Sequence, residues 1–255
     1  MLRAAAPLMR AILAGAALLA ACAAWADMPL HKAPALEPLP IKVGERLEYK
    51  VKLGIIGAGT QTMEIAAKET MNGAPVFKLL SKSQPSSALK RIYSFYDEKT
   101  SYIHLNTLLP IRYEKDIQDR SYKAKFLVRF DRSADEAKVW KDGAFESTVS
   151  LKPFTQDELS MIYYMRSRDL RPGETYTYDF FTGRKVHSVK IHVKSRVFVD
   201  APKPIGKRPA LRIEASDGFR MWLTADADRL PVKIEAPVKF FGTLKAELSK
   251  YRAGR

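Results

Sequence analysis

The stretch Arg46-Leu47-Glu48-Tyr49-Lys50-Val51-Lys52-Leu53 decides the fold class, because apolar and charged side chains alternate along its whole length. Successive side chains of a β-strand point to opposite faces, so this alternation places the apolar side chains together on one face. Parallel sheets bury both faces, whereas antiparallel sheets often keep one face in water. Residues 46–53 therefore predict a half-buried strand of an antiparallel sheet.

The same alternation returns along much of the chain. It is present in residues 122–130, 189–199, 211–215, 219–223 and 230–234. Residue pairs that tolerate positive φ separate several strands, and Asn72-Gly73, Asp142-Gly143 and Asp217-Gly218 each predict a tight hairpin. Glycines at positions 54, 57 and 59 predict a bulge or a sharp bend. The sequence therefore predicts a mainly β fold, either a curved antiparallel sheet of about eight to ten strands or a partly open β-barrel.

One main helix is predicted across this sheet. Thr155-Gln156-Asp157-Glu158 has the spacing of a capping box, in which the Thr155 oxygen accepts from an early amide and Glu158 returns the bond. Pro172-Gly173 ends the segment. Residues near one face of the helix recur at i, i+3, i+4 and i+7: Leu159, Ile162, Tyr163 and Arg166. Amphipathic packing explains this spacing without any catalytic function. We therefore expect a helix that plugs or crosses the open side of the sheet, and no catalytic role for Asp157 or Tyr164.

Residues 1–26 have the three parts of an export signal, namely a basic start, an apolar run over residues 11–25 and a small-residue exit. The apolar run has 15 residues, fewer than the roughly 20 that a membrane-spanning helix needs. Ala24-Trp25-Ala26 fits ordinary cleavage before Asp27. The alternative is Leu19-Ala20-Ala21-Cys22, which resembles a lipobox and would acylate Cys22, the only cysteine of the chain. We therefore expect a periplasmic protein, or alternatively a lipoprotein anchored to a membrane through Cys22.

The exported part of the chain divides into two segments. Residues 27–40 contain four prolines and predict an extended, Pro-rich tether. Residues 41–252 predict a single β-rich domain. Charged residues recur every few positions from Lys42 onward, so no transmembrane span is expected in the mature chain.

The chain is strongly basic, with 43 Lys and Arg against 28 Asp and Glu, a formal net charge of +15. Removing Arg3 and Arg10 with the signal peptide leaves +13. Such a charge favours anionic partners such as phospholipid head groups or lipopolysaccharide, and export argues against nucleic acid. One predicted strand concentrates this charge, and its candidate ligand-binding residues are Lys190, His192, Lys194 and Arg196. The alternative is a solvated outer face whose lysines deter edge-to-edge pairing.

Catalytic and metal chemistry have little basis in the sequence. The chain has four histidines, and His187 and His192 are predicted on opposite faces of one strand. The motifs of zinc peptidases, serine hydrolases and phosphate-binding loops do not occur. We therefore expect no enzyme, no catalytic residues, no metal site and no cofactor.

The inner face of a curved sheet offers a second kind of site. An apolar cavity for an acyl chain would be lined by Tyr176, Tyr178 and Phe180, or by Tyr122, Phe126 and Phe130. The alternative is a filled core. Our leading hypothesis is a non-enzymatic binding module for a lipid or another anionic envelope component. The alternative is a protein-interaction or scaffold component of an envelope assembly, which would use an exposed sheet edge or the basic face.

Several short motifs also carry a family resemblance. They are Gly44-Glu45-Arg46-Leu47-Glu48-Tyr49, Gly57-Ala58-Gly59, the run from Gln156 to Arg166, Leu223-Thr224-Ala225-Asp226 and Arg229-Leu230-Pro231-Val232. In this order and spacing they resemble the bacterial envelope family known as domain of unknown function 3108, over about Gly44 to Leu248. The resemblance implies no activity, substrate or catalytic residue.

Overall fold

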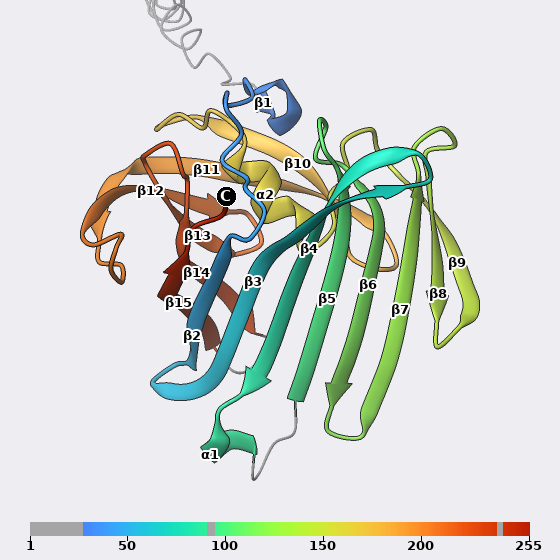
Figure 1. The fold of residues 1–255 in the computed structure, drawn as a ribbon, viewed down its shortest axis with the longest axis horizontal. Coiled ribbons are helices and arrows are strands. Elements are labelled where there is room, and N and C mark those ends of the chain that lie inside the picture. Colours follow the sequence, from blue (N-terminus) through green and yellow to red (C-terminus); the bar gives the residue numbers. More distant parts are fainter. Residues whose placement is uncertain (1–27, 91–94, 239–241) are drawn as a thin grey trace, which may run out of the picture.

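The computed structural model describes residues 28–90, 95–238 and 242–255 (Figure 1). The predicted signal peptide and Cys22 lie outside these residues. The strands are β1 (Met28–Pro29), β2 (Arg46–Leu53), β3 (Ile56–Met71), β4 (Ala74–Pro85), β5 (Phe95–His104), β6 (Pro110–Asp119), β7 (Tyr122–Asp131), β8 (Glu136–Lys141), β9 (Ala144–Ser150), β10 (Thr175–Phe181), β11 (Val186–Val199), β12 (Arg208–Ala215), β13 (Arg220–Thr224), β14 (Pro231–Val238) and β15 (Gly242–Arg252). The helices are η1 (Leu30–Lys32), α1 (Ser87–Lys90) and α2 (Ser160–Arg166).

All described strands belong to one 15-stranded sheet in the order β1-β10-β11-β12-β13-β14-β15-β2-β3-β4-β5-β6-β7-β8-β9. Every pairing is antiparallel except the short contact between β1 and β10. The sheet curves strongly but does not close, since β1 and β9 are its two ends. The predicted curved, partly open antiparallel sheet with one main helix is therefore confirmed, although the number of strands is larger than predicted.

Turn chemistry places the hairpins where the sequence predicts them. Asn72 and Gly73 have φ of 50° and 79°, and Asp142 and Gly143 have 51° and 85°, the left-handed values of a tight hairpin. Gly218 has φ of 89° between β12 and β13. A bulge lies in β3 opposite Val51 and Lys52, within the glycine-rich stretch. These local predictions are confirmed.

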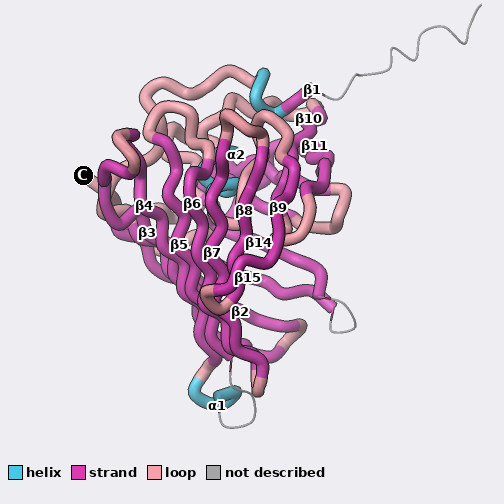
Figure 2. Tube along the Cα trace, turned by 90° about the vertical axis from the view of Figure 1, so that its right-hand side faces the viewer, coloured by secondary structure: helices cyan, strands magenta, loops and turns pink. Residues whose placement is uncertain are grey.

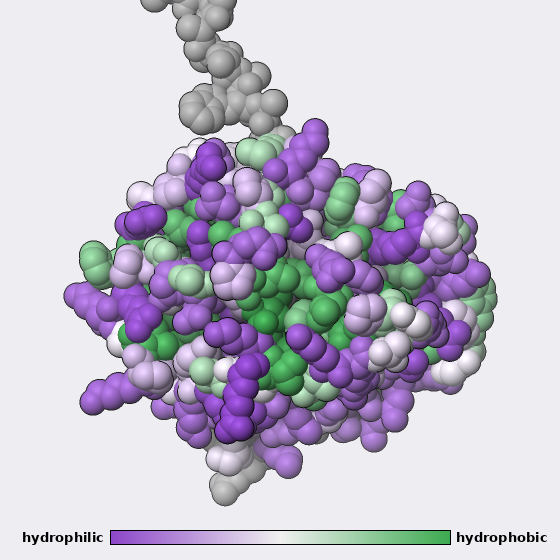
Figure 3. Space-filling model, turned by 45° about the horizontal axis from the view of Figure 1, so that its top comes forward, coloured by the Kyte–Doolittle hydropathy of each residue, from purple (hydrophilic) through white to green (hydrophobic). Residues whose placement is uncertain are grey.

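Helix α2 lies inside the curved sheet, among the upper ends of the strands in Figures 1 and 2. The main apolar core surrounds it and joins residues from both arms of the sheet. A smaller apolar cluster fills the space between β6–β9 and Phe181 of β10. Figure 3 shows hydrophobic residues gathered at the centre of this end of the molecule, with hydrophilic residues around them. The interior is therefore packed, with Tyr176 and Phe130 buried in these two clusters rather than lining an acyl cavity.

The N-terminus of α2 corrects the predicted capping box. The Oδ1 atom of Asp157 accepts from the backbone N–H groups of Leu159 at 2.8 Å and Ser160 at 2.7 Å, and Ser160 Oγ accepts from the Asp157 N–H at 2.8 Å. The reciprocal cap thus starts two residues later than predicted. Thr155 Oγ1 instead accepts from the Lys152 N–H, and Glu158 points to the sheet. Carboxylate and hydroxyl side chains cap helices at the same spacing, so the sequence alone did not show whether the cap begins at Thr155 or at Asp157.

The buried surface of α2 is wider than the predicted stripe. Six of the seven helix residues are buried, and Ile162 is partly exposed but still packs against the main core. A helix enclosed by a sheet is buried nearly all round, which removes the amphipathic pattern.

The Pro-rich segment is extended but packed. Leu30 and Ala33 are buried in the main core. The Leu36 N–H donates to the Ser167 carbonyl at 2.9 Å, and the Asp169 N–H donates to the Pro34 carbonyl at 2.9 Å. Residues 28–40 therefore form part of the packed domain and cover the end of α2. Among the described residues, no helix is long and apolar enough to cross a membrane.

Candidate functional site

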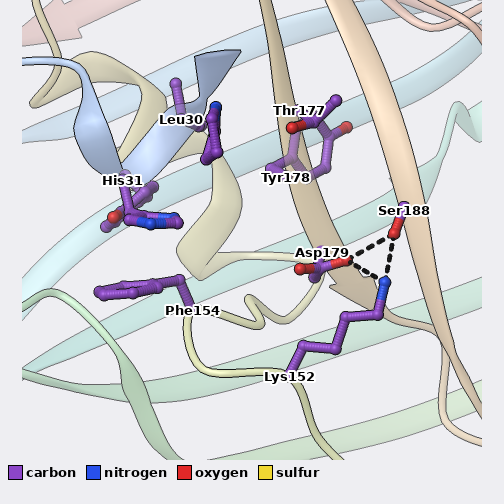
Figure 4. A pocket seen from close by; sticks show the side chains of 10 residues that line it. Leu30, His31, Lys152, Phe154, Thr177, Tyr178, Asp179 and Ser188 are labelled. Atoms are coloured by element: carbon purple, nitrogen blue, oxygen red, sulfur yellow. Dashed lines mark hydrogen bonds and ion pairs between the residues drawn. The ribbon is translucent and has the colours of Figure 1, made fainter. Parts of the chain in front are cut away.

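A pocket of about 290 Å³ opens at the edge of β10 (Figure 4). Strand β1 pairs with Tyr176 and Thr177, and Gln156 forms an isolated bridge with Phe180. The pocket lies in the interval between these two contacts, so we call it the edge pocket. Its lining residues come from five segments: Pro29, Leu30, His31, Lys152, Phe154, Tyr164, Thr177, Tyr178, Asp179 and Ser188.

Three side chains form the polar end of the edge pocket (Figure 4). Lys152 Nζ lies 3.0 Å from Asp179 Oδ1 and 2.5 Å from Ser188 Oγ. The Ser188 hydroxyl donates to Asp179 Oδ1 at 2.7 Å. Serine and lysine together occur in some hydrolases, where the lysine takes the proton of the serine hydroxyl. Here Lys152 donates to Ser188 and the Ser188 hydroxyl donates to Asp179, so this arrangement fits binding better than nucleophilic catalysis.

An aromatic wall stands opposite. The rings of His31 and Phe154 are stacked, with centroids 3.9 Å apart and planes inclined by 9°. Burial lowers the pKa of His31, and the nearby charges of Lys32 and Arg168 lower it further, against an opposing effect of Asp179. The imidazole is therefore favoured in its neutral form, which suits an apolar wall.

Tyr164 of α2 contributes a buried polar atom. The residue is 1% exposed, and its hydroxyl has no hydrogen-bond partner among the described residues. Burial raises the pKa of Tyr164, while Arg168, whose guanidinium carbon lies 4.4 Å from the ring centroid, acts in the opposite direction. A buried hydroxyl without a partner costs free energy, and a bound ligand would remove this cost. Tyr178, another pocket residue, also has its pKa raised by burial.

The edge pocket combines features that suit a small ligand with one anionic and one apolar part. Its volume is near the lower limit for ligand sites, roughly 300 Å³. Three cations, Lys32, Lys152 and Arg168, lie in or beside it against one acid, Asp179. Leu30, Phe154 and the tyrosines supply the apolar surface.

The predicted basic strand reaches this pocket on one side. Lys190, His192 and Lys194 lie at alternate positions after Ser188 on β11, so all four share the outer face of the sheet. His192 Nδ1 lies 3.1 Å from Thr175 Oγ1, and Lys194 Nζ lies 3.5 Å from a Glu214 oxygen. The structure thus brings three of the four predicted ligand-binding residues together.

Arg196 is placed differently, and here the prediction is wrong. A bulge interrupts β11, because Val193 pairs with Ile213 whereas Arg196 pairs with Leu211. Ile213 and Leu211 are two residues apart on β12 and share its core face, so Arg196 lies on the face opposite to Lys194. An inserted residue reverses the alternation, and the sequence carries no glycine or proline at this point to mark it.

The pocket residues Lys152, His31 and Tyr164 were not predicted. They come from a loop, from the segment assigned as a tether and from the helix, so no single motif joins them. These three residues come close together only because their segments pack against β10 in the folded protein. The one local signal is the combination of lysine and phenylalanine in Lys152-Pro153-Phe154, which is too common to define a site.

A second polar cluster lies under the start of α2, on the inner face of β5 and β6. Glu158 accepts from Lys115 at 3.1 Å and lies 2.9 Å from Lys99, which also contacts Asp97 at 2.9 Å. Burial alone would raise the pKa of Glu158, but the two lysines outweigh it and lower the pKa to about 2. Every charge in this cluster has an opposite partner, so the cluster fixes the helix to the sheet.

The other end of α2 is fixed in the same way. Arg166 forms a two-bond ion pair with Glu45, at 2.6 and 2.8 Å, and donates to the carbonyls of Pro40 at 2.9 Å and Asp228 at 3.1 Å. The guanidinium group is fully buried. Asp157, Glu158 and Arg166 therefore hold the helix in position. In the part of the chain that the structure describes, no group of His, Cys, Asp and Glu is arranged to hold a metal ion.

Together these features define a class of mainly β proteins in which a half-open barrel encloses one short helix and carries a small pocket at the sheet edge. The chain belongs to the family described as protein of unknown function, DUF3108, whose family model matches residues 48–249. A solved structure with a similar fold is the crystal structure of a beta-barrel-like protein of domain of unknown function DUF1849 from Brucella abortus. The two chains are 13% identical, the match covers 82% of this chain and 97% of that one, and the TM-score is 0.51. No curated protein matches the chain.

Proposed function

We propose that the protein is a non-enzymatic binding module of the cell envelope, which takes a lipid or another anionic, partly apolar envelope component into the edge pocket. Its predicted export and its basic charge motivate the compartment and the sign of the ligand. One observation carries the site: a single pocket joins Lys152 to an aromatic wall and to the unpartnered hydroxyl of Tyr164.

The packed interior favours the edge pocket over a cavity inside the barrel. Tyr176 and Phe130 are buried among core side chains, and Tyr122 is exposed. The ligand's head group would meet Lys152 and Ser188, and the beginning of an acyl chain would lie against Leu30 and Phe154. The outer face with Lys190 and His192 continues from Ser188 and would attract further anionic groups.

Two measurements test this function. Organic extraction of the purified protein, followed by lipid mass spectrometry, should find a bound envelope lipid. Calorimetric titration with dihexanoyl phosphatidylglycerol, used as a monomeric lipid, should show binding that weakens as salt rises. Dihexanoyl phosphatidylcholine should bind more weakly, because its head group carries no net charge.

Variants of the pocket sharpen the titration. Lys152→Gln should weaken binding roughly fivefold, the effect of losing about 1 kcal/mol of ionic hydrogen bonding. Tyr164→Phe should weaken it by a smaller factor while preserving the ring. Lys50→Gln, an equally charge-reducing change at an exposed position in the middle of β2, is the control and should bind normally. Protein that is empty on extraction and shows no lipid affinity would refute the proposal.

A scaffold role is the second candidate, and strand β9 favours it. Among the described residues β9 pairs only with β8, so its other edge is open to an added strand. Its sequence, Ala-Phe-Glu-Ser-Thr-Val-Ser, has neither the lysines nor the proline that usually protect an edge. Crosslinking in cells separates the two functions, because a stoichiometric protein partner captured through β9 would favour the scaffold.

A further inference from the structure

Large apolar side chains are exposed mainly at hairpin tips. Ile55 is 99% exposed and Ile56 is 64% exposed, both at the turn between β2 and β3. Tyr122 begins β7 and Phe145 lies at the start of β9, and both are also exposed. Four of the six large hydrophobic side chains exposed among the described residues therefore lie at the turns of three hairpins.

These turns share one side of the molecule. In an antiparallel sheet, turns that follow every second strand lie at the same end of the strands. The turns β2–β3, β6–β7 and β8–β9 meet this condition, together with helix α1 between β4 and β5. In Figure 1 all four lie along the lower side of the sheet, opposite the end where α2 and the edge pocket lie. We call this side the hairpin edge.

The β2–β3 turn forms an apolar finger. Ile55 and Ile56 stand between Gly54, whose φ is 60°, and Gly57. No heavy atom lies within 4 Å of the position that a Cβ would occupy at either glycine, so the finger projects into open space. A protruding tip cannot enclose a small ligand, but it can enter the head-group region of a lipid layer.

The charges at the hairpin edge are predominantly basic. At the four tips the cationic residues are Lys52, Lys90, Arg120, Lys123, Lys125 and Lys141, and the acidic residues are Asp116, Asp119, Asp142 and Glu146. Lys125 pairs with Asp116 at 3.4 Å, and Lys52 pairs with Glu247 of β15 at 3.2 Å. Asp142 also serves its own turn, because its Oδ1 accepts from the Lys125 N–H at 2.8 Å. Lys141 Nζ lies 5.4 Å from the centroid of the Tyr122 ring, which places a cation beside an exposed aromatic group. Exposed apolar tips with neighbouring cations complement an anionic lipid surface.

We propose that the hairpin edge docks on the surface of an anionic lipid bilayer, with Ile55 and Ile56 inserted between head groups and the surrounding lysines facing the phosphates. Docking in this orientation leaves the edge pocket on the opposite side and so does not depend on the pocket's ligand.

Co-sedimentation with large vesicles tests the docking. The protein should bind vesicles of phosphatidylglycerol and phosphatidylethanolamine, and should bind phosphatidylcholine vesicles much less. The double variant Ile55→Ser/Ile56→Ser should bind the anionic vesicles at least roughly tenfold more weakly, because two apolar side chains no longer leave water. Phe198→Ser is the matched control, since this 71% exposed apolar residue lies on β11, outside the hairpin edge.

Equal binding of the isoleucine variant and the native protein would overturn the proposal, as would an absence of binding to anionic vesicles. Retained binding of the isoleucine variant together with loss of binding by the Phe198 variant would place the contact elsewhere and also overturn it. Lys152→Gln, which tests the edge pocket, should leave vesicle binding unchanged. The two proposals therefore fail independently.

Discussion

Replacing Arg166 by methionine should strongly destabilise the protein. The substitution leaves Glu45, whose side chain is 6% exposed, as a buried carboxylate without its cation. Breaking a buried ion pair in this way costs roughly 3–5 kcal/mol. Since a domain is stable by only about 5–15 kcal/mol, the loss is a large part of the free energy of unfolding.

A double-mutant cycle isolates the pair from the other bonds of Arg166. Glu45→Met should cost a similar amount, because it leaves the buried cation unpaired. The double variant should cost only roughly 2–3 kcal/mol, mainly for the bonds lost at the carbonyls of Pro40 and Asp228. The coupling energy between the two positions should therefore be at least about 3 kcal/mol.

Urea unfolding followed by tryptophan fluorescence and circular dichroism measures these free energies. The exposed pair of Lys52 and Glu247 is the control, with the two charged atoms 3.2 Å apart. Glu247→Gln should cost no more than about 1 kcal/mol. Additive effects of the Glu45 and Arg166 substitutions, within about 0.5 kcal/mol, would refute the argument that this pair fixes α2.

Two further predictions concern the sheet and its contact with α2. Glu158→Gln should lower the free energy of unfolding by roughly 1–3 kcal/mol at neutral pH. Because the folded pKa of Glu158 is about 2 and the ordinary value is 4.5, the native protein should lose this advantage as pH falls through that interval; a pH-independent difference in urea unfolding would contradict the assignment. Gly59→Ala should cost roughly 2 kcal/mol, because its Cβ would lie 2.0 Å from the Gln84 carbonyl oxygen. Gly57→Ala meets no neighbouring atom, so its thermal unfolding should remain near that of the native protein, and equal losses at both glycines would contradict the steric explanation.

The sequence predicted those parts of the fold that depend on neighbouring residues. Alternation at residues 46–53 and the Asn72-Gly73 turn each reflect one strand or one hairpin. Strands β5 and β6 were not predicted, because charged and polar side chains such as Lys99 and Lys115 lie on their inner face. Those lysines face inward because Glu158 of α2 pairs with them, and no local pattern shows this partner.

The candidate site was predicted less completely for a related reason. The outer face of β11 was correctly assigned as far as Lys194, and the bulge then reversed the position of Arg196. The edge pocket needs residues near positions 30, 153, 164 and 178 to meet, which depends on the curvature of the whole sheet. Sequence periodicity predicts single strands and helices, but it does not predict which of them lie next to one another in the folded sheet.

The polar residues of α2 also indicate where function is to be sought. Asp157 caps the helix, and Glu158 and Arg166 hold its two ends against the sheet, so their charged groups have partners within the domain. Tyr164 lies on the same helix but keeps a hydroxyl without a partner and lines the edge pocket. A ligand gains the most binding free energy from polar groups that the fold holds in place without a hydrogen-bond partner, because folding has already removed these groups from water. The fixed helix therefore gives Tyr164 a defined place in the pocket, and the pocket rather than the ion pairs is the part of this region suited to binding.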